Sequence, residues 1–100
     1  SNLPPVVGIP LEDLTIPAGE TSQLVLDEET FIDPDEGDAL RYQAYLGEDA
    51  ELPRWVRFDA LNRMFRFKPP QGSSGSVEIR VVARDFAGLE ASTSFTVRYG

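Results

Sequence analysis

The sequence predicts an all-β protein, a seven-stranded antiparallel Greek-key β-sandwich. Two observations lead to this class. Apolar and polar side chains alternate with a period of two through most of the chain, and no stretch sustains a helical repeat beyond a single turn. The eight prolines and eight glycines lie mostly between these alternating runs, where they mark turns at regular spacing. The expected strands cover residues 11–16, 22–26, 40–46, 55–58, 63–67, 77–84 and 91–99.

In the N-terminal half the strand signals are short. Residues 1–10 begin SNLPPVV and are expected to form an N-terminal linker or edge segment, which leaves residues 11–100 as the domain. LTI at 14–16 and SQLVL at 22–26 are brief apolar runs. LRYQAYL at 40–46 is clearer, because its apolar side chains alternate with polar ones as in a half-buried strand.

The C-terminal half carries the stronger pattern. WVRF is a short apolar run, and RMFRFK sets two phenylalanines against polar neighbours. In SVEIRVVARD, Val77, Ile79 and Val81 fall on one face, and TSFTVRY alternates in the same way. We therefore expect a core built from the inward positions of these strands. Its expected members are Leu24, Leu26, Leu40, Tyr42, Trp55, Phe65, Phe67, Ile79, Val81, Phe95 and Val97.

Composition excludes several classes of function. The chain has no cysteine and no histidine, so it lacks disulfides, thiolate metal ligands and the commonest general base. A net charge of −8 argues against nucleic acid as a partner, and no apolar run is long enough for membrane insertion. One hundred residues also leave little room for a catalytic cleft, and no nucleophile elbow is present. We expect no catalytic activity.

One stretch concentrates acidic chemistry, FIDPDEGDALRY at residues 31–42. In a chain of antiparallel strands, alternate loops emerge at the same end, so Asp33, Asp35 and Asp38 should lie near Asp85. Calcium takes six to eight oxygen ligands from such loops. Asp, Pro and Gly are also what any tight loop favours, since Asp side chains cap their own backbone. Spacing alone leaves both interpretations open, a calcium loop and a solvated turn.

Three segments together resemble a known family. FIDPDEGDALRYQAYL, LPRWVRFDALNRMFRFKP and VEIRVVARDFAGLEASTSFTV are similar, in order and spacing, to the dystroglycan-type cadherin-like domains of bacterial surface or secreted proteins. The likeness spans roughly residues 31–97. It implies an immunoglobulin/cadherin-like sandwich at an extracellular or cell-surface location, acting as an adhesion or interaction module of a larger multidomain protein.

The resemblance also implies a calcium site between successive domains. Related cadherin repeats use an Asp-x-Asp in one loop and the Asp of A-x-D at a strand end, which correspond to Asp33, Asp35 and Asp85. Asn2 stands where a cadherin linker offers an asparagine ligand, and Asp38 would be a supporting carboxylate. Calcium is therefore the expected cofactor, with affinity weakened where a preceding module is missing.

Departures from the cadherin pattern limit this expectation. IPAG at 16–19 and FKPP at 67–70 replace the acidic motifs that cadherins use at the opposite pole, so no complete site is expected there. LNRM replaces the family's T-G-x-F turn, which puts Asn62 at the expected positive-φ position.

Other side chains are candidates for binding. Tyr45 should point away from the core, and Phe86 and Leu89 flank a turn where they could pack against a neighbouring domain. Trp55 is expected mainly in the core, with an exposed sugar-stacking role as the alternative. A basic stripe on residues 54–68 is expected to block edge-to-edge strand pairing, or else to contact an acidic neighbour. The stripe comprises Arg54, Arg57, Arg63, Arg66 and Lys68.

Two functions from different classes follow. The first is a calcium-dependent adhesion module whose partners are neighbouring domains of the same chain and another surface protein or polysaccharide. The alternative is a carbohydrate-binding or spacer module attached to a polysaccharide-active enzyme, without calcium. Tandem copies in the neighbouring sequence would favour the first, and an adjoining catalytic domain would favour the second.

Overall fold

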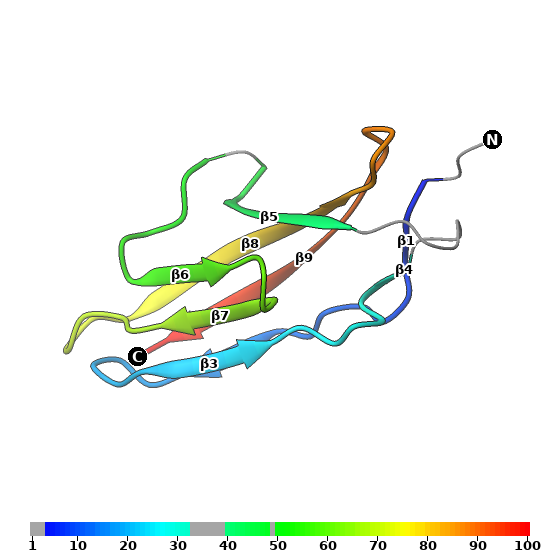
Figure 1. Cartoon of the computed structure of the whole chain (residues 1–100). Coiled ribbons are helices and arrows are strands. Elements are labelled where there is room, and N and C mark those ends of the chain that lie inside the picture. The colour runs from blue at the N-terminus through cyan, green and yellow to red at the C-terminus, as the bar shows by residue number, and fades with distance from the viewer. Residues whose placement is uncertain (1–3, 33–39, 49) are drawn as a thin grey trace.

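The structure is a computed structural model that describes residues 4–32, 40–48 and 50–100 (Figure 1). Within these residues the regular elements are strands, and no helix is long and apolar enough to cross a membrane. The strands are β1 (Val6–Val7), β2 (Leu14–Ile16), β3 (Ser22–Val25), β4 (Phe31–Ile32), β5 (Arg41–Leu46), β6 (Val56–Asp59), β7 (Met64–Phe67), β8 (Gly75–Arg84) and β9 (Glu90–Tyr99).

Two sheets form the sandwich. One has the order β2-β9-β8-β5 and the other the order β3-β7-β6 (Figure 1). The long β8–β9 hairpin is antiparallel from Gly75 opposite Tyr99 to Arg84 opposite Glu90. These two sheets contain all seven strands expected from the alternation of side chains. The all-β sandwich class is confirmed.

The pairing differs from a purely antiparallel sandwich in one place. β2 runs parallel to β9, with Leu14 opposite Val97 and Ile16 opposite Tyr99. Just before β2, an Asp13 carboxylate oxygen accepts a hydrogen bond from the Thr96 backbone N–H at 2.9 Å. That side chain supplies an acceptor beyond the start of the short strand, so the β2–β9 association extends past its three residues.

A separate two-stranded ribbon lies at one end of the molecule. β1 pairs antiparallel with β4, with Val6 opposite Ile32 and Val7 opposite Phe31. Part of the expected N-terminal linker or edge segment is therefore an edge strand of this ribbon. The ribbon lies at the same end as the β8–β9 turn, and the C-terminus lies at the other end (Figure 1).

The core lies between the two sheets and is rich in stacked phenylalanines. Phe65 is fully buried, and its ring centroid lies 4.4 Å from that of Phe58 and 5.6 Å from those of Phe67 and Phe95. The expected core residues that are buried are Leu26, Phe65, Phe67, Ile79, Val81, Phe95 and Val97. Those that are only partly buried against it are Leu24, Leu40, Tyr42 and Trp55.

Some buried residues were not expected in the core. They are Ile16, Phe31, Val56 and Val82. Phe31 belongs to β4, a strand of two residues that is too short to show an alternation of apolar and polar side chains. Burial at such positions comes from tertiary packing and not from a local pattern.

The turn between β6 and β7 corrects one expectation. The non-glycine residue with positive φ is Arg63, at 54°, and not Asn62. Asp59 explains the difference, because its Oδ1 accepts backbone hydrogen bonds from Leu61 at 3.1 Å and Asn62 at 3.3 Å. These bonds hold Asn62 within the turn and leave the next residue to reverse the chain into β7, as in four-residue hairpin loops.

Candidate functional site

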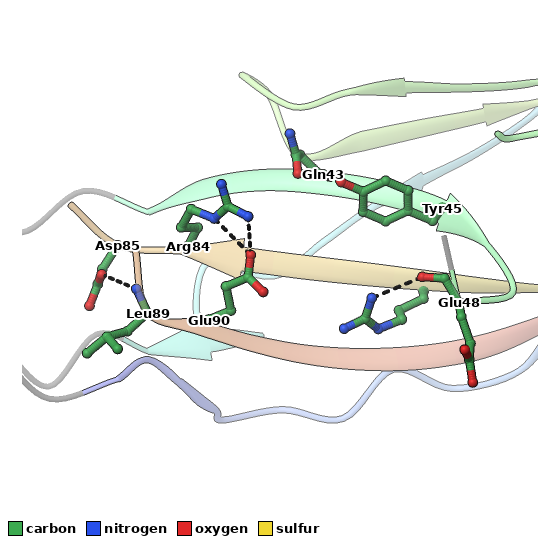
Figure 2. Close-up of polar contacts among 8 residues, drawn as sticks. Gln43, Tyr45, Glu48, Arg84, Asp85, Leu89 and Glu90 are labelled. Atoms are coloured by element: carbon green, nitrogen blue, oxygen red, sulfur yellow. Dashed lines mark hydrogen bonds and ion pairs between the residues drawn. The ribbon is translucent and has the colours of Figure 1, made fainter. Parts of the chain in front are cut away.

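The β8–β9 turn holds the one expected calcium ligand that the structure describes. Asp85 follows the last residue of β8 and is only 4% exposed. Its Oδ1 accepts a hydrogen bond from the Leu89 backbone N–H at 2.9 Å, and its own N–H donates to the Leu89 carbonyl at 3.0 Å (Figure 2). Gly88 has φ of 86°, which glycine adopts without strain. Asp85 thus closes the turn with one carboxylate oxygen.

The other carboxylate oxygen of Asp85 has no such role. Oδ2 is buried and has no hydrogen-bond partner among the described residues. A buried carboxylate oxygen is costly unless a cation or a hydrogen-bond donor compensates it. The arrangement can therefore accept one further positive or donating group beside the turn.

The remaining expected ligands cannot be placed beside Asp85. Asp33, Asp35, Asp38 and Asn2 lie outside the described residues. Among residues 4–32, 40–48 and 50–100, no cluster of three or more acidic side chains could hold a metal ion. The calcium site remains a prediction.

The expected binding side chains lie in two different places. Phe86 is 69% exposed and Leu89 is 38% exposed, so the β8–β9 turn presents apolar surface at its tip. Tyr45 lies within β5 opposite Arg80 and is partly buried, and its hydroxyl donates to Gln43 Oε1 at 2.5 Å (Figure 2). Arg84 and Glu90 form an ion pair beside the turn. Tyr45 is therefore not part of the Asp85 turn.

A second candidate site lies on the outer face of the β3-β7-β6 sheet. Arg66 of β7 is directly opposite Arg57 of β6 and Gln23 of β3. Two residues further along each strand, the Lys68 backbone N–H donates to the Trp55 carbonyl at 2.9 Å, which continues the same pairing. Because side chains alternate along strands, the exposed side chains of Arg57, Arg66 and Lys68 share one face.

This face is hollowed into an open groove of about 470 Å³, called here the basic groove. Its lining residues are Thr21, Arg54, Trp55, Arg57, Arg66, Phe67 and Lys68. Trp55 is partly buried, and its ring centroid lies 4.7 Å from that of Tyr99. The groove thus combines a firmly packed aromatic side chain with four exposed cations, which suits a ligand with both a flat apolar face and negative charge.

The structure changes the interpretation of the basic stripe. Arg63 is not grouped with the other cations of the stripe. Its guanidinium lies 3.6 Å from the Glu28 carboxylate and donates a hydrogen bond to the Leu26 carbonyl. Arg66 belongs to β7, the central strand of its sheet, and Lys68 follows directly. Charge on a central strand cannot protect a sheet edge, so edge protection can account only for residues on or beside β6.

The sequence predicted most of the residues that line this groove, but it did not predict that they lie together. The basic residues and Trp55 were visible as a pattern, but the central position of β7 was not. Thr21 carried no signal, since it reaches the groove only because β3 pairs with β7.

The chain belongs to a family of immunoglobulin-like domains. Residues 4–100 match the family described as "Putative Ig domain", also called He_PIG. The immunoglobulin-like part of the expected resemblance is confirmed, and the dystroglycan-type cadherin-like assignment within it remains a proposal. A comparison with curated protein sequences finds no significant match.

Solved structures share the fold at low sequence identity. A nucleoside hydrolase-related hypothetical protein from Saccharophagus degradans, described as associated with carbohydrate metabolism, is 21% identical with a TM-score of 0.69, over 100% of this chain and 26% of that one. A protein from Bacteroides fragilis described as a "putative alpha-galactosidase/melibiase" is 11% identical with a TM-score of 0.66, over 96% of this chain and 17% of that one. The chain therefore spans about a quarter or less of these proteins, in which the similar region is one part of a longer chain.

Proposed function

We propose that this chain is a non-catalytic carbohydrate-binding module of a larger, extracellular, carbohydrate-active protein. The basic groove carries the proposal, because the partly buried Trp55 lines this open groove and the exposed part of its ring can contact a sugar ring. Its packing against Tyr99 fixes the ring before any ligand arrives, which lowers the entropic cost of binding.

The structural neighbours support this proposal. The similar region lies within proteins described as associated with carbohydrate metabolism or as an alpha-galactosidase, and it forms a minor part of each. An immunoglobulin-like module in such a position has neighbouring domains as its first partners, and it serves to bring substrate to them or to space them apart.

Sedimentation with insoluble polysaccharides tests the proposal. The chain is mixed with cellulose, chitin, mannan and homogalacturonan coupled to beads, and the fraction removed with each polymer is measured. We expect retention on at least one polymer and a clear loss of retention for Trp55→Leu. Tyr45→Leu, a matched aromatic change on the opposite sheet, should bind as the unaltered chain does. Absence of retention on every polymer would contradict carbohydrate binding.

A second candidate function, a calcium-dependent adhesion module of dystroglycan-type cadherin-like character, is favoured by one observation. Asp85 Oδ2 is buried and lacks a hydrogen-bond partner within the described residues, so a cation beside it would offset its desolvation. The proposed further ligands are Asp33, Asp35, Asp38 and Asn2, the residues that the cadherin-like pattern of the sequence implies. The exposed Phe86 and Leu89 would then contact a preceding module.

A further inference from the structure

We propose that the ligand of the basic groove is an acidic polysaccharide, in which carboxylate groups on the sugar rings pair with the groove's arginines. This inference rests on the proposed function, because it names the class of carbohydrate that the module binds. It differs from that function in requiring charge as well as a sugar ring.

The basic groove collects positive charge on an acidic molecule. The chain carries 17 acidic and nine basic residues, yet four of the basic ones line this single groove. They are Arg54, Arg57, Arg66 and Lys68. The groove is therefore a local positive region on an acidic molecule, and the rest of the surface repels a polyanion and directs it there.

These cations are left without carboxylate partners by the described part of the chain. The ion pairs found there join Arg63 to Glu28 and Arg84 to Glu90, both outside the groove. Asp59 lies close enough to Arg66 for the arginine to contribute to lowering its pKa, but hydrogen bonds from Asn62 are the larger cause. The carboxylate is thus already occupied within its own turn.

Two of the groove's arginines are placed where one anion can contact both. Arg57 and Arg66 are directly opposite each other across two antiparallel strands, where like charges repel. A carboxylate placed between two guanidinium groups removes this repulsion and accepts charge-assisted hydrogen bonds from both. An anion that relieves the repulsion between Arg57 and Arg66 therefore binds more tightly than it would beside a single arginine.

The aromatic side chain in the groove distinguishes a sugar acid from other anions. Trp55 lines the same groove as the two arginines, so a ligand that fills it needs a ring face to stack on the indole beside its negative charge. A uronic acid residue has both features in one unit. A flexible acidic peptide supplies the charge but no ring, and a neutral glycan supplies the ring but no charge.

The test uses one polymer in two charge states. Binding to polygalacturonate and to its fully methyl-esterified form is measured by affinity electrophoresis and titration calorimetry at low and high salt. We expect binding to the acid form, weakening as salt rises. Arg57→Gln combined with Arg66→Gln should lower the affinity about tenfold or more, since charge-assisted hydrogen bonds are commonly worth at least that factor.

Matched controls make the outcome decisive. Arg41→Gln combined with Arg98→Gln removes the same charge from exposed positions on the other sheet, and it should leave binding nearly unchanged. Melting curves of both double variants establish that they are folded. An equal loss of affinity in the two double variants would overturn the assignment to the groove.

The remaining outcomes distinguish the two proposals. Equal binding of the acid and esterified polymers would overturn this inference and leave carbohydrate binding intact. Equal competition by polyglutamate at matched charge would also overturn it, because the groove would then fit an acidic protein surface. Absence of binding to either form, with no retention on the neutral polysaccharides, would remove both this inference and the proposed function.

Discussion

Arg57 and Arg66 occupy directly opposed positions on β6 and β7, with their charged side chains on the outer face of the sheet. Opposed like charges on a sheet are unfavourable, commonly by a few tenths of a kcal/mol up to about 1 kcal/mol per pair. The arrangement therefore reduces the stability of the free domain at the place where we propose that charge serves binding.

The first prediction is that removing one of these charges stabilises the free domain. Arg66→Thr should raise the free energy of unfolding by about 0.2–1 kcal/mol at low salt, because it removes repulsion and introduces a β-branched side chain into a strand. Urea denaturation measures the change, which should shrink in high salt as the charges are screened. Arg98→Thr is the matched control, with an expected effect within about 0.5 kcal/mol. A destabilised Arg66→Thr variant would show that the guanidinium packs favourably in the free protein.

Arg66→Thr, together with Arg57→Thr, also tests the role of strand position. β7 is central and β6 lies at a sheet edge, so Arg66→Thr should leave self-association unchanged while Arg57→Thr should increase it. Light scattering at increasing protein concentration measures both. An increase for Arg66→Thr alone would contradict the edge argument.

The second prediction concerns Asp59 and pH. A hydrogen bond from the Asn62 side chain, at 2.8 Å, is the largest cause that lowers the pKa of Asp59 below its ordinary value. A carboxyl with a lowered folded-state pKa stabilises the fold above its unfolded-state pKa, about 3.9, and this contribution is lost as the pH falls through the folded-state value. Asn62→Ala should raise the pKa of Asp59, as followed by NMR titration of its side-chain carboxyl carbon.

The third prediction concerns the aromatic core. Phe65→Ala should lower the free energy of unfolding by about 3–5 kcal/mol, because Phe65 is fully buried among three other phenylalanine rings. Chemical denaturation measures the loss. Leu61, which is 90% exposed, provides the control, and Leu61→Ala should change stability by less than about 0.5 kcal/mol. A small effect at Phe65 would mean that the two sheets do not pack as described.

The fourth prediction concerns calcium. If Asp85 Oδ2 faces a bound cation, the melting temperature should rise with millimolar calcium and return to its starting value with chelator. Asp85→Asn and Asp35→Asn should each abolish the rise. Asp85→Asn retains an oxygen that can accept the Leu89 hydrogen bond, so its effect on calcium is separable from loss of the turn. Glu48→Gln, at an exposed position, should leave the rise intact. If calcium does not shift the melting temperature, either of this domain alone or of the domain with its native neighbour attached, the calcium site is contradicted and Asp85 only closes the turn.

Much of the fold could be predicted because the evidence for strands is local. For Ile79, Val81 and Phe95, the alternation of side chains along each strand predicted burial, and all three are buried in the structure. Gly88 and the residues around it similarly mark a turn by their own backbone preferences. The sequence alone therefore determined the class of protein, its principal strands and most of its core.

Tertiary structure decided which of these strands are neighbours and what their side chains meet. The parallel pairing of β2 with β9 joins residues more than 80 positions apart, which no local pattern encodes. The basic stripe in the sequence predicted that Arg66 protects a sheet edge, but the structure places Arg66 on the central strand β7. Arg63 does not belong with the other cations of the stripe, because it pairs with Glu28. The physical reason is that alternation specifies the face on which a side chain lies, while pairing partners and groove shape depend on long-range packing that only the folded chain defines.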